Sequence, residues 1–272
     1  MRYPGGKACL FDAVKKLLAE NNLTGGTYAE PFAGGAGLAL KLLLAGNVSE
    51  IHINDIDRSV YAFWHSVLNE TDRFIETVLK TDITVAEHDR QFKIQQEKEK
   101  AALFELGFST FFLNRTNVSG VLRGGIIGGR QQTGKYKIDA RFNKEALTDR
   151  IRTIAGLRER IHVHNKDGAA FLSELEKNMP ERSLVFLDPP YYEKGAYLYY
   201  NHFRHKDHAV LAEAVMNYSK PWIVSYDNVP EICQLYKPKK FKVYSLNYSA
   251  RSHCKGSEIM FFGDMLKPVA IA

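Results

Sequence analysis

A short apolar strand, a glycine-rich turn and a helix follow one another in residues 26–46, and this order restricts the fold more than any other feature. GTYAEPF (26–32) reads as a strand, AGGAG supplies the turn, and the following helix ends near Gly46. A second strand and helix are predicted at 51–55 and 57–69. Strands that alternate with helices predict an α/β fold with a parallel sheet. Such sheets bind ligands at the carboxyl ends of their strands.

This alternation stops near residue 70 and resumes near residue 150. Residues 70–115 have a mainly helical pattern, whereas 116–142 are rich in Gly, Arg, Gln and Thr and predict a long loop or hairpin. We therefore expect one sheet domain formed by residues 1–69 and 151–272, with an inserted module at 70–150. After residue 143 the pattern predicts a helix, strands at 161–165, 183–188, 221–226, 240–247 and 258–263, and helices at 168–177 and 206–219.

Positive charge is concentrated in one part of the chain. Residues 115–160 contain eleven Lys/Arg against four Asp/Glu, while the whole chain has a formal net charge of +6. A basic segment of this kind favours a polyanionic partner such as nucleic acid, although a solvated basic face gives the same pattern. The sequence has no apolar run near the ~20 residues that cross a bilayer, no secretory signal and no CxxC pair. We expect a cytoplasmic protein without a membrane, disulfide or metal site.

Acidic residues follow three of the predicted strands. Glu30 precedes the glycines of the first turn, and a carboxylate there opposes a phosphate and favours a ligand with a cationic or amino group. Asp55 follows the second strand, where an acid binds ribose hydroxyls in nucleoside-binding folds; a helix cap is the alternative role for Asp55 or Asp57. Asp167 either accepts a hydrogen bond from an adenine amino group or caps a helix.

The stretch DPPY follows the apolar strand SLVFL and carries the strongest chemical signal. Asp188 and the carbonyl of Pro190 can accept both hydrogens of an amino group, because the two prolines fix the backbone and remove its donors. Tyr191 can stack on the ring that bears this amine. Two acceptors aimed at the hydrogens free the nitrogen lone pair, which a nucleobase otherwise delocalises into its ring. The stretch therefore predicts a reaction centre for the amine of a nucleobase. Asp188→Ala should abolish the reaction with little loss of stability.

Five stretches occur in an order that matches a known family. They are RYPGGK (2–7), EPFAGGAG (30–37), NDID (54–57), LNRTNVSGVLR (113–123) and DPPY (188–191). With them the chain resembles the Dam-like (D12 class, alpha group) adenine-specific DNA methyltransferases. In this family tryptophan often stands where Tyr3 is, asparagine stands where Ser119 is, and residues 249–262 match the late motif only loosely.

The resemblance implies a Rossmann-like methyltransferase fold, with a mostly parallel seven-stranded sheet and an inserted, mainly helical DNA-recognition domain. It implies methyl transfer from S-adenosylmethionine to the N6 amine of an adenine flipped out of duplex DNA. Catalysis is assigned to Asp188, Pro189, Pro190 and Tyr191. Cofactor contacts are assigned to Tyr3, Lys7, Glu30, Phe32, Gly34, Gly35, Gly37, Asp55, Asp167 and Asp188.

DNA contacts are expected from the basic insertion, with Arg123 either reading a guanine or contacting the backbone. The other candidates are Arg115, Asn117, Arg130, Lys135 and Lys137. His202, His205 and His208 are expected at a helix entry or beside the loop after DPPY. Three alternatives stay open: an adenine methyltransferase of RNA or another nucleic acid, a protein methyltransferase, and a catalytically silent DNA-binding relative. The resemblance suits a bacterial, archaeal or phage protein that acts as a monomer or weak dimer, with or without a cognate restriction endonuclease.

Overall fold

The chain forms two compact units in the computed structural model, which describes residues 1, 6–193, 203–247 and 255–271. One unit, here called the helical unit, comprises residues 1–6 and 55–165. The other, called the sheet unit, comprises residues 7–54 and 166–272. Tyr3, His202 and residues 249–254 of the late motif lie outside the described residues, so their predicted roles stay predictions.

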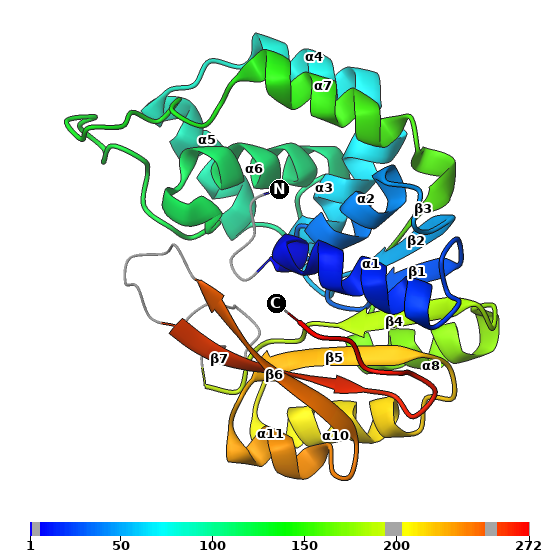
Figure 1. The fold of residues 1–272 in the computed structure, drawn as a ribbon. Coiled ribbons are helices and arrows are strands. Elements are labelled where there is room, and N and C mark those ends of the chain that lie inside the picture. Colours follow the sequence, from blue (N-terminus) through cyan, green and yellow to red (C-terminus); the bar gives the residue numbers. More distant parts are fainter. Residues whose placement is uncertain (2–5, 194–202, 248–254, 272) are drawn as a thin grey trace. The chain divides into compact units, whose positions relative to one another are not determined.

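Seven strands form one sheet in the order β3-β2-β1-β4-β5-β7-β6 (Figure 1). β1 is parallel to β2 and β4, and β4 is parallel to β5. β7 is antiparallel to both of its neighbours. The predicted mostly parallel seven-stranded sheet is confirmed. The strands are β1 (Thr27–Glu30), β2 (Glu50–Asn54), β3 (Ile161–His164), β4 (Ser183–Leu187), β5 (Trp222–Asp227), β6 (Lys240–Asn247) and β7 (Lys255–Phe262).

Helices cover both faces of the sheet unit, with α1 and α2 on one face and α8, α10 and α11 on the other (Figure 1). The second face is fully apolar at its centre, where Val185 and Val224 of neighbouring strands pack on Leu175 and Leu211. Burying each such side chain contributes roughly 1.5–3 kcal/mol. The helices are η1 (Lys7–Leu10), α1 (Phe11–Glu20), α2 (Gly37–Leu44), α8 (Gly168–Asn178), α10 (His205–Met216) and α11 (Pro230–Leu235).

The register of the strands separates apolar from polar side chains. Leu187 pairs with Val224 in the β4–β5 ladder, so the next step brings Asp188 level with Ser225. Successive side chains of a strand point to opposite faces. Asp188 and Ser225 therefore lie on the face opposite to the apolar packing against α8 and α10. Glu258 of β7 pairs with Asp227 and shares this polar face.

The helical unit is built around the packing of α3 on α6. A Cβ on Gly107 would lie 2.4 Å from the carbonyl oxygen of Ala62, so only glycine permits this approach. Phe74 packs edge-on against Phe63 and Phe111 beside it. These helices confirm the helical pattern predicted for 70–115. The elements are α3 (Arg58–Asn69), α4 (Thr71–Lys80), α5 (Val85–Gln96), α6 (Leu103–Thr116), η2 (Val118–Gly120), α7 (Lys144–Ala155) and η3 (Arg158–Arg160), followed by β3.

Residues 121–143 contain no helix or strand. An isolated bridge between Asn117 and Ile126 closes the first part of the predicted hairpin or loop at 116–142. By packing, the helical unit extends to residues 55 and 165 and includes α3 and α7 as well as the predicted insertion. The domain boundaries predicted at residues 69 and 151 describe how catalysis and DNA recognition are divided along the chain, and they stay a prediction. Within the described residues, no helix is both long and apolar enough to cross a membrane.

Candidate active site

The turn between β1 and α2 has the tight geometry that its glycines predicted. Gly34 and Ala36 both adopt a positive φ of 46°, which costs an alanine roughly 1–2 kcal/mol. A Cβ on Gly37 would lie 3.3 Å from the Cβ of Ala8, so the start of α2 packs closely against η1. Gly35 lies in the same turn. The backbone is therefore compact where the family motif predicts the cofactor.

Phe32 follows β1 and packs on the first residue of α8. A Cβ on Gly168 would lie 2.3 Å from the Phe32 ring, so this approach requires glycine. The ring also lies edge-on to Phe203, with centroids 6.0 Å apart. Asp167 caps α8 by accepting hydrogen bonds from the amides of Ala169 and Ala170. The alternative role predicted for Asp167, a helix cap, is thus observed, and its contact with the cofactor stays a prediction.

Glu30 is buried at the end of β1 and is held by neighbours rather than by solvent. Its Oε1 accepts hydrogen bonds from the Tyr28 hydroxyl at 3.0 Å and the Ala39 amide at 3.1 Å. Burial raises the pKa of Glu30 to about 8, against the lowering effect of the Tyr28 and Ala39 hydrogen bonds; the nearby Asp188 raises it further. The raised pKa favours the protonated form of Glu30 at neutral pH, and its hydrogen bonds brace the β1–α2 turn. Its predicted contact with the cofactor stays a prediction.

Asp188 forms a part-buried ion pair with Lys7, and one of its two oxygens accepts no hydrogen bond from the described residues. The Lys7 ammonium lies 2.9 Å from both carboxylate oxygens and donates a hydrogen bond to Oδ2. Oδ1 is buried and faces this ammonium, but none of the described residues gives it a hydrogen bond. The ammonium also lies 4.9 Å from the centroid of the Tyr191 ring. Burial raises the pKa of Asp188 to about 6, against the lowering effect of Lys7. The structure thus brings Lys7, Asp188 and Tyr191 together.

This ion pair corrects one expectation. The side chain of Lys7 is only 3% exposed. Removing one partner of a buried ion pair strands the other charge and costs about 3–5 kcal/mol. Asp188→Ala should therefore lower stability as well as activity.

A clamp on β5 and α10 holds the segment that follows DPPY. Asp227 at the end of β5 is buried, and its two oxygens accept the amides of Tyr192 and Glu193, each at 2.9 Å. The Tyr192 hydroxyl lies 3.1 Å from His205 Nδ1. His208 Nδ1 lies 3.1 Å from the Tyr226 hydroxyl, and burial lowers the pKa of His208 to about 4. His205 and His208 thus lie at the start of α10 beside this loop, as predicted.

A hydrogen-bonded chain of three residues continues the polar face beyond Asp188. The Ser225 and Tyr244 hydroxyls are 2.8 Å apart, and the Tyr244 hydroxyl donates to Oε2 of Glu258 at 2.8 Å. Glu258 is fully buried, and among the described residues its Oε1 has no hydrogen-bond partner. None of the three was predicted. Their signal is weak, because polar residues within the strands YSLN and SEIMFF read as ordinary alternation.

Asn54 is a further residue that the sequence did not predict, although it adjoins Asp55. Its amide donates to the carbonyls of Pro31 and Lys166 and accepts the Lys166 amide, all at 2.9 Å. It therefore ties the end of β1 to the segment that enters α8. Its signal was its place at the end of an apolar strand, directly before Asp55.

Asp55 and Asp57 belong to the helical unit, and Asp57 has the capping role that was considered for either residue. Asp57 caps α3 by accepting the Ser59 amide at 2.9 Å, and Asp55 accepts the Asp57 amide at 2.9 Å. Lys98 also forms an ion pair with Asp57 at 2.9 Å. Asp55 thus shapes the turn before α3. Its predicted contact with a ribose stays a prediction.

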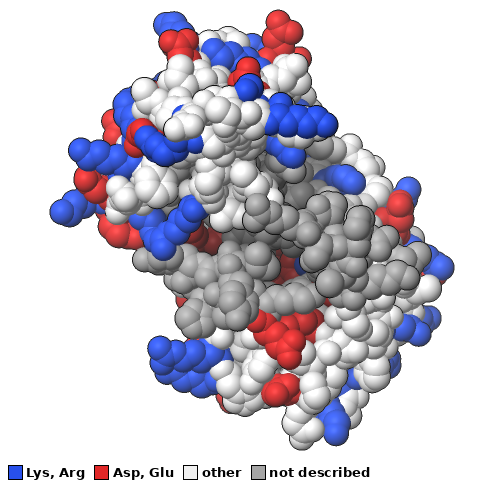
Figure 2. Space-filling model, turned by 90° about the vertical axis from the view of Figure 1, so that its left-hand side faces the viewer, with Lys and Arg blue, Asp and Glu red and all other residues white. Residues whose placement is uncertain are grey.

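The predicted DNA-binding cations differ in how they are held. Arg130 forms two hydrogen bonds of 2.8 Å with Asp89, yet its side chain remains 67% exposed. Lys137 donates to the carbonyl of Gln132, and Lys135 lies over the Tyr136 ring. Arg123 is exposed. Figure 2 shows Lys and Arg interspersed with Asp and Glu over one face of the molecule, so positive charge forms no uniform stripe there.

Asn117 requires a correction, because its side chain is unavailable to DNA. The residue is fully buried. Its amide donates to the carbonyls of Val121 and Leu122, and its oxygen lies 2.7 Å from His88 Nε2. Asn117 therefore shapes the loop after α6 instead of contacting a nucleic acid. Arg115 is half-buried, and burial lowers its pKa, with a smaller effect of Arg150.

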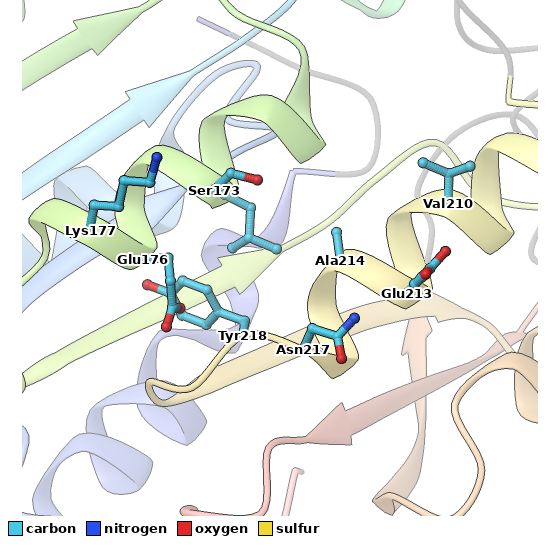
Figure 3. Close-up of a pocket in the computed structure, with 9 residues that line it drawn as sticks. Ser173, Glu176, Lys177, Val210, Glu213, Ala214, Asn217 and Tyr218 are labelled. Carbon is cyan, nitrogen blue, oxygen red and sulfur yellow. The ribbon is translucent and has the colours of Figure 1, made fainter.

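An open groove between α8 and α10 was also considered as a site. Its volume is about 500 Å³, and Figure 3 shows Glu176 and Tyr218 close together within it. Its described lining comes from α8, α10 and the two residues that follow α10, Asn217 and Tyr218, on the apolar face of the sheet unit. None of these lining residues is among those predicted for catalysis or binding. The groove is therefore distinct from the candidate active site.

Comparisons with known proteins identify a family for the chain. The family model described as D12 class N6 adenine-specific DNA methyltransferase matches residues 3–250. No curated protein matches the chain. Among solved structures, the chain is similar to a putative methyltransferase, yhhF, from Escherichia coli (11% identity, 93% of this chain and 85% of that one, TM-score 0.39). It is also similar to the rRNA methyltransferase aviRa from Streptomyces viridochromogenes (14% identity, 94% of this chain and 83% of that one, TM-score 0.41). Likenesses this distant carry no argument about substrate.

Proposed function

Because the chain belongs to the D12 class N6 adenine-specific DNA methyltransferases, we propose that it methylates the N6 amine of adenine in duplex DNA at the pocket formed by Asp188, Pro190 and Tyr191. It is a methyltransferase that uses S-adenosylmethionine, as its family does. The choice of DNA, the flipping of the target base and the residue roles below are proposals.

Oδ1 of Asp188, which faces the Lys7 ammonium but accepts no hydrogen bond from the described residues, is the observation that carries this proposal. Buried polar atoms without partners are rare in proteins. Here one stands directly before two prolines, beside the ring of Tyr191. An exocyclic amine supplies the missing hydrogen, and the carbonyl of Pro190 accepts the second one. With both hydrogens held, the nitrogen lone pair can point out of the ring plane.

The residues near Asp188 also fit the cofactor. S-adenosylmethionine, when bound, supplies a methyl group on a positively charged sulfur. The carboxylates of Asp188, which is 20% exposed, and of buried Glu258 outnumber the single positive charge of Lys7, so this pocket suits a cationic ligand. The tight turn of Gly34, Ala36 and Gly37 lets a ligand approach the backbone, as the family motif implies.

Lys7 and the clamp prepare this pocket before substrate arrives. The ammonium of Lys7 holds Asp188 in place and favours its charged form. The clamp through Asp227 fixes the backbone next to Tyr191. Such positioning of acceptor and ring accounts for catalysis by orientation, without a covalent enzyme intermediate. The amine becomes positively charged as it gains the methyl group, and Asp188 is placed to accept the proton that it then loses.

In the helical unit, the exposed cations offer the phosphate contacts that such a substrate requires. Arg123, Arg130 and Lys135 lie on the loop that Asn117 shapes. We assign to them backbone contacts that position the duplex, with Arg123 the candidate for reading a base.

Matched substrates test the proposed choice of DNA. Methyl transfer from labelled S-adenosylmethionine should be measured on unmethylated duplex DNA and on RNA transcribed from the same sequences. The proposal predicts label in DNA and none above background in RNA. Preferential labelling of RNA would replace the proposed substrate with RNA while leaving the methyltransferase assignment intact.

A further inference from the structure

Three buried oxygen atoms near the proposed reaction centre make no hydrogen bond to the residues that the structure describes. They are Oδ1 of Asp188, the hydroxyl of Tyr191 and Oε1 of Glu258. Asp188 and Tyr191 hold the target amine in the proposed mechanism, whereas Glu258 has so far been given only a share in the negative charge of the pocket. A fully buried carboxylate oxygen without a partner is costly unless a ligand supplies a donor or a positive charge.

The strands place Glu258 on the side of Asp188 that faces β5. Asp188 lies level with Ser225, whose hydroxyl bonds to Tyr244, and Tyr244 in turn donates to Glu258. Glu258 also raises the pKa of Asp188 and of Tyr191, after the larger effect of burial on each. Its charge therefore acts on the two side chains that are proposed to hold the target amine.

Tyr244 fixes the orientation of this carboxylate. Its hydroxyl binds Oε2 at 2.8 Å, and the two residues are paired in the β6–β7 ladder. The other oxygen, Oε1, is left available. An anion held in this way gains more from a nearby positive charge than a mobile surface carboxylate, because it is shielded from solvent.

We propose that Glu258 is a binding residue for the positive charge at the point of methyl transfer, and that it makes the pocket prefer cationic ligands to neutral ones. This inference rests on the proposed location of the active site. It predicts that Glu258 discriminates the charged methyl donor from the uncharged product left after transfer. Because the sulfur loses its positive charge when the methyl group is transferred, the attraction to Glu258 would end and the product would be released more easily.

Two ligands that differ at one position test this role without any nucleic acid. S-adenosylhomocysteine has a neutral thioether at the point of transfer, whereas sinefungin has an ammonium group there. Dissociation constants of both should be measured by calorimetry for the wild type and Glu258→Gln. Glu213→Gln is the matched control, because it removes the same charge from an exposed position on α10.

Glu258→Gln should weaken sinefungin roughly tenfold and change S-adenosylhomocysteine less than about twofold. Glu213→Gln should change neither. A parallel loss for both ligands, or no loss for either, would overturn the proposal. If Glu258→Gln does not fold, Tyr244→Phe can replace it, because this variant keeps the charge of Glu258 but removes the hydrogen bond that orients its carboxylate. A loss of affinity that is smaller and confined to sinefungin would support the role. Equal losses of affinity for both ligands would refute it. Because no DNA is present, the result is independent of whether DNA is the substrate.

Discussion

Substitution of Lys7 by methionine should change the pH dependence of methyl transfer. Lys7 is the buried partner that favours the charged form of Asp188, whose pKa is about 6 despite burial. Methionine keeps the apolar part of the side chain and removes the charge. The proposed chemistry needs Asp188 as an acceptor, so its protonation should abolish transfer.

The size of the effect follows from the loss of one nearby positive charge. An opposite charge at this range lowers the pKa of a carboxyl group by about 1–3 units. Removing it should raise the pKa of Asp188 from about 6 to roughly 8. At pH 7 the charged fraction then falls from about nine-tenths to about one-tenth, which predicts a rate loss of roughly tenfold.

A pH–rate profile under single-turnover conditions, with saturating cofactor and DNA, measures this shift. The acid limb of Lys7→Met should move upward by about two units, and activity should recover toward the wild-type value near pH 9. Lys16→Met, at an exposed position on α1, is the matched control and should keep the wild-type profile. An equal loss at every pH, accompanied by weaker cofactor binding, would refute this reasoning and leave Lys7 with the cofactor contact that its motif implies.

Four further changes have specific expected outcomes. The folded-state pKa of Glu30, about 8, exceeds its ordinary value of 4.5, so its stabilising contribution is lost as the pH rises from 4.5 through 8. Chemical denaturation should show Glu30→Gln gaining several kcal/mol relative to the wild type over that range, and parallel pH curves would contradict this. Asn117→Ala should lower stability by about 1–3 kcal/mol, because it leaves His88 and two carbonyls unpaired, and should weaken DNA binding while calorimetry finds unchanged cofactor affinity. Ala36→Gly should raise the free energy of unfolding by roughly 1 kcal/mol, because glycine relieves the strain of its positive φ; a loss would show that the turn relaxes differently. Asp227→Ala should speed hydrogen exchange at the two amides that it binds and slow methyl transfer, and unchanged exchange would exclude the clamp.

The alternation of apolar segments was sufficient to predict most of the fold. Strands buried on both faces read as short apolar runs, and each was found within about two residues of its predicted position, except that β7 begins at Lys255 rather than 258. The short helix α11 was missed, because its six residues contain too little periodicity. By packing, the helical unit extends beyond the predicted insertion, to residues 55 and 165. Helix packing determines this extent, as at Gly107, and a sequence pattern does not record which helices meet.

The candidate site was predictable where residues are adjacent in sequence and not where they meet only in space. Asp188 and Tyr191 stand in one stretch, so their proximity could be read directly. Lys7 lies 181 positions from Asp188, and their ion pair depends on how η1 meets β4. Glu258 was missed for the same reason. Asn117 shows the opposite error: a polar residue in a basic loop suggested a DNA contact, but burial gave it a structural role.

Nucleoside analysis after methyl transfer tests the central claim most directly. Wild type and Asp188→Asn should be incubated with labelled S-adenosylmethionine and unmethylated genomic DNA, and the digested nucleosides separated. Asparagine keeps the size of the side chain. Its amide oxygen should accept the hydrogen bond from Lys7, so its NH2 group would lie where the target amine needs an acceptor. The account predicts label in N6-methyladenine for the wild type and none for the variant. Label in another nucleoside, or an Asp188→Asn variant that retains the wild-type rate, would contradict it.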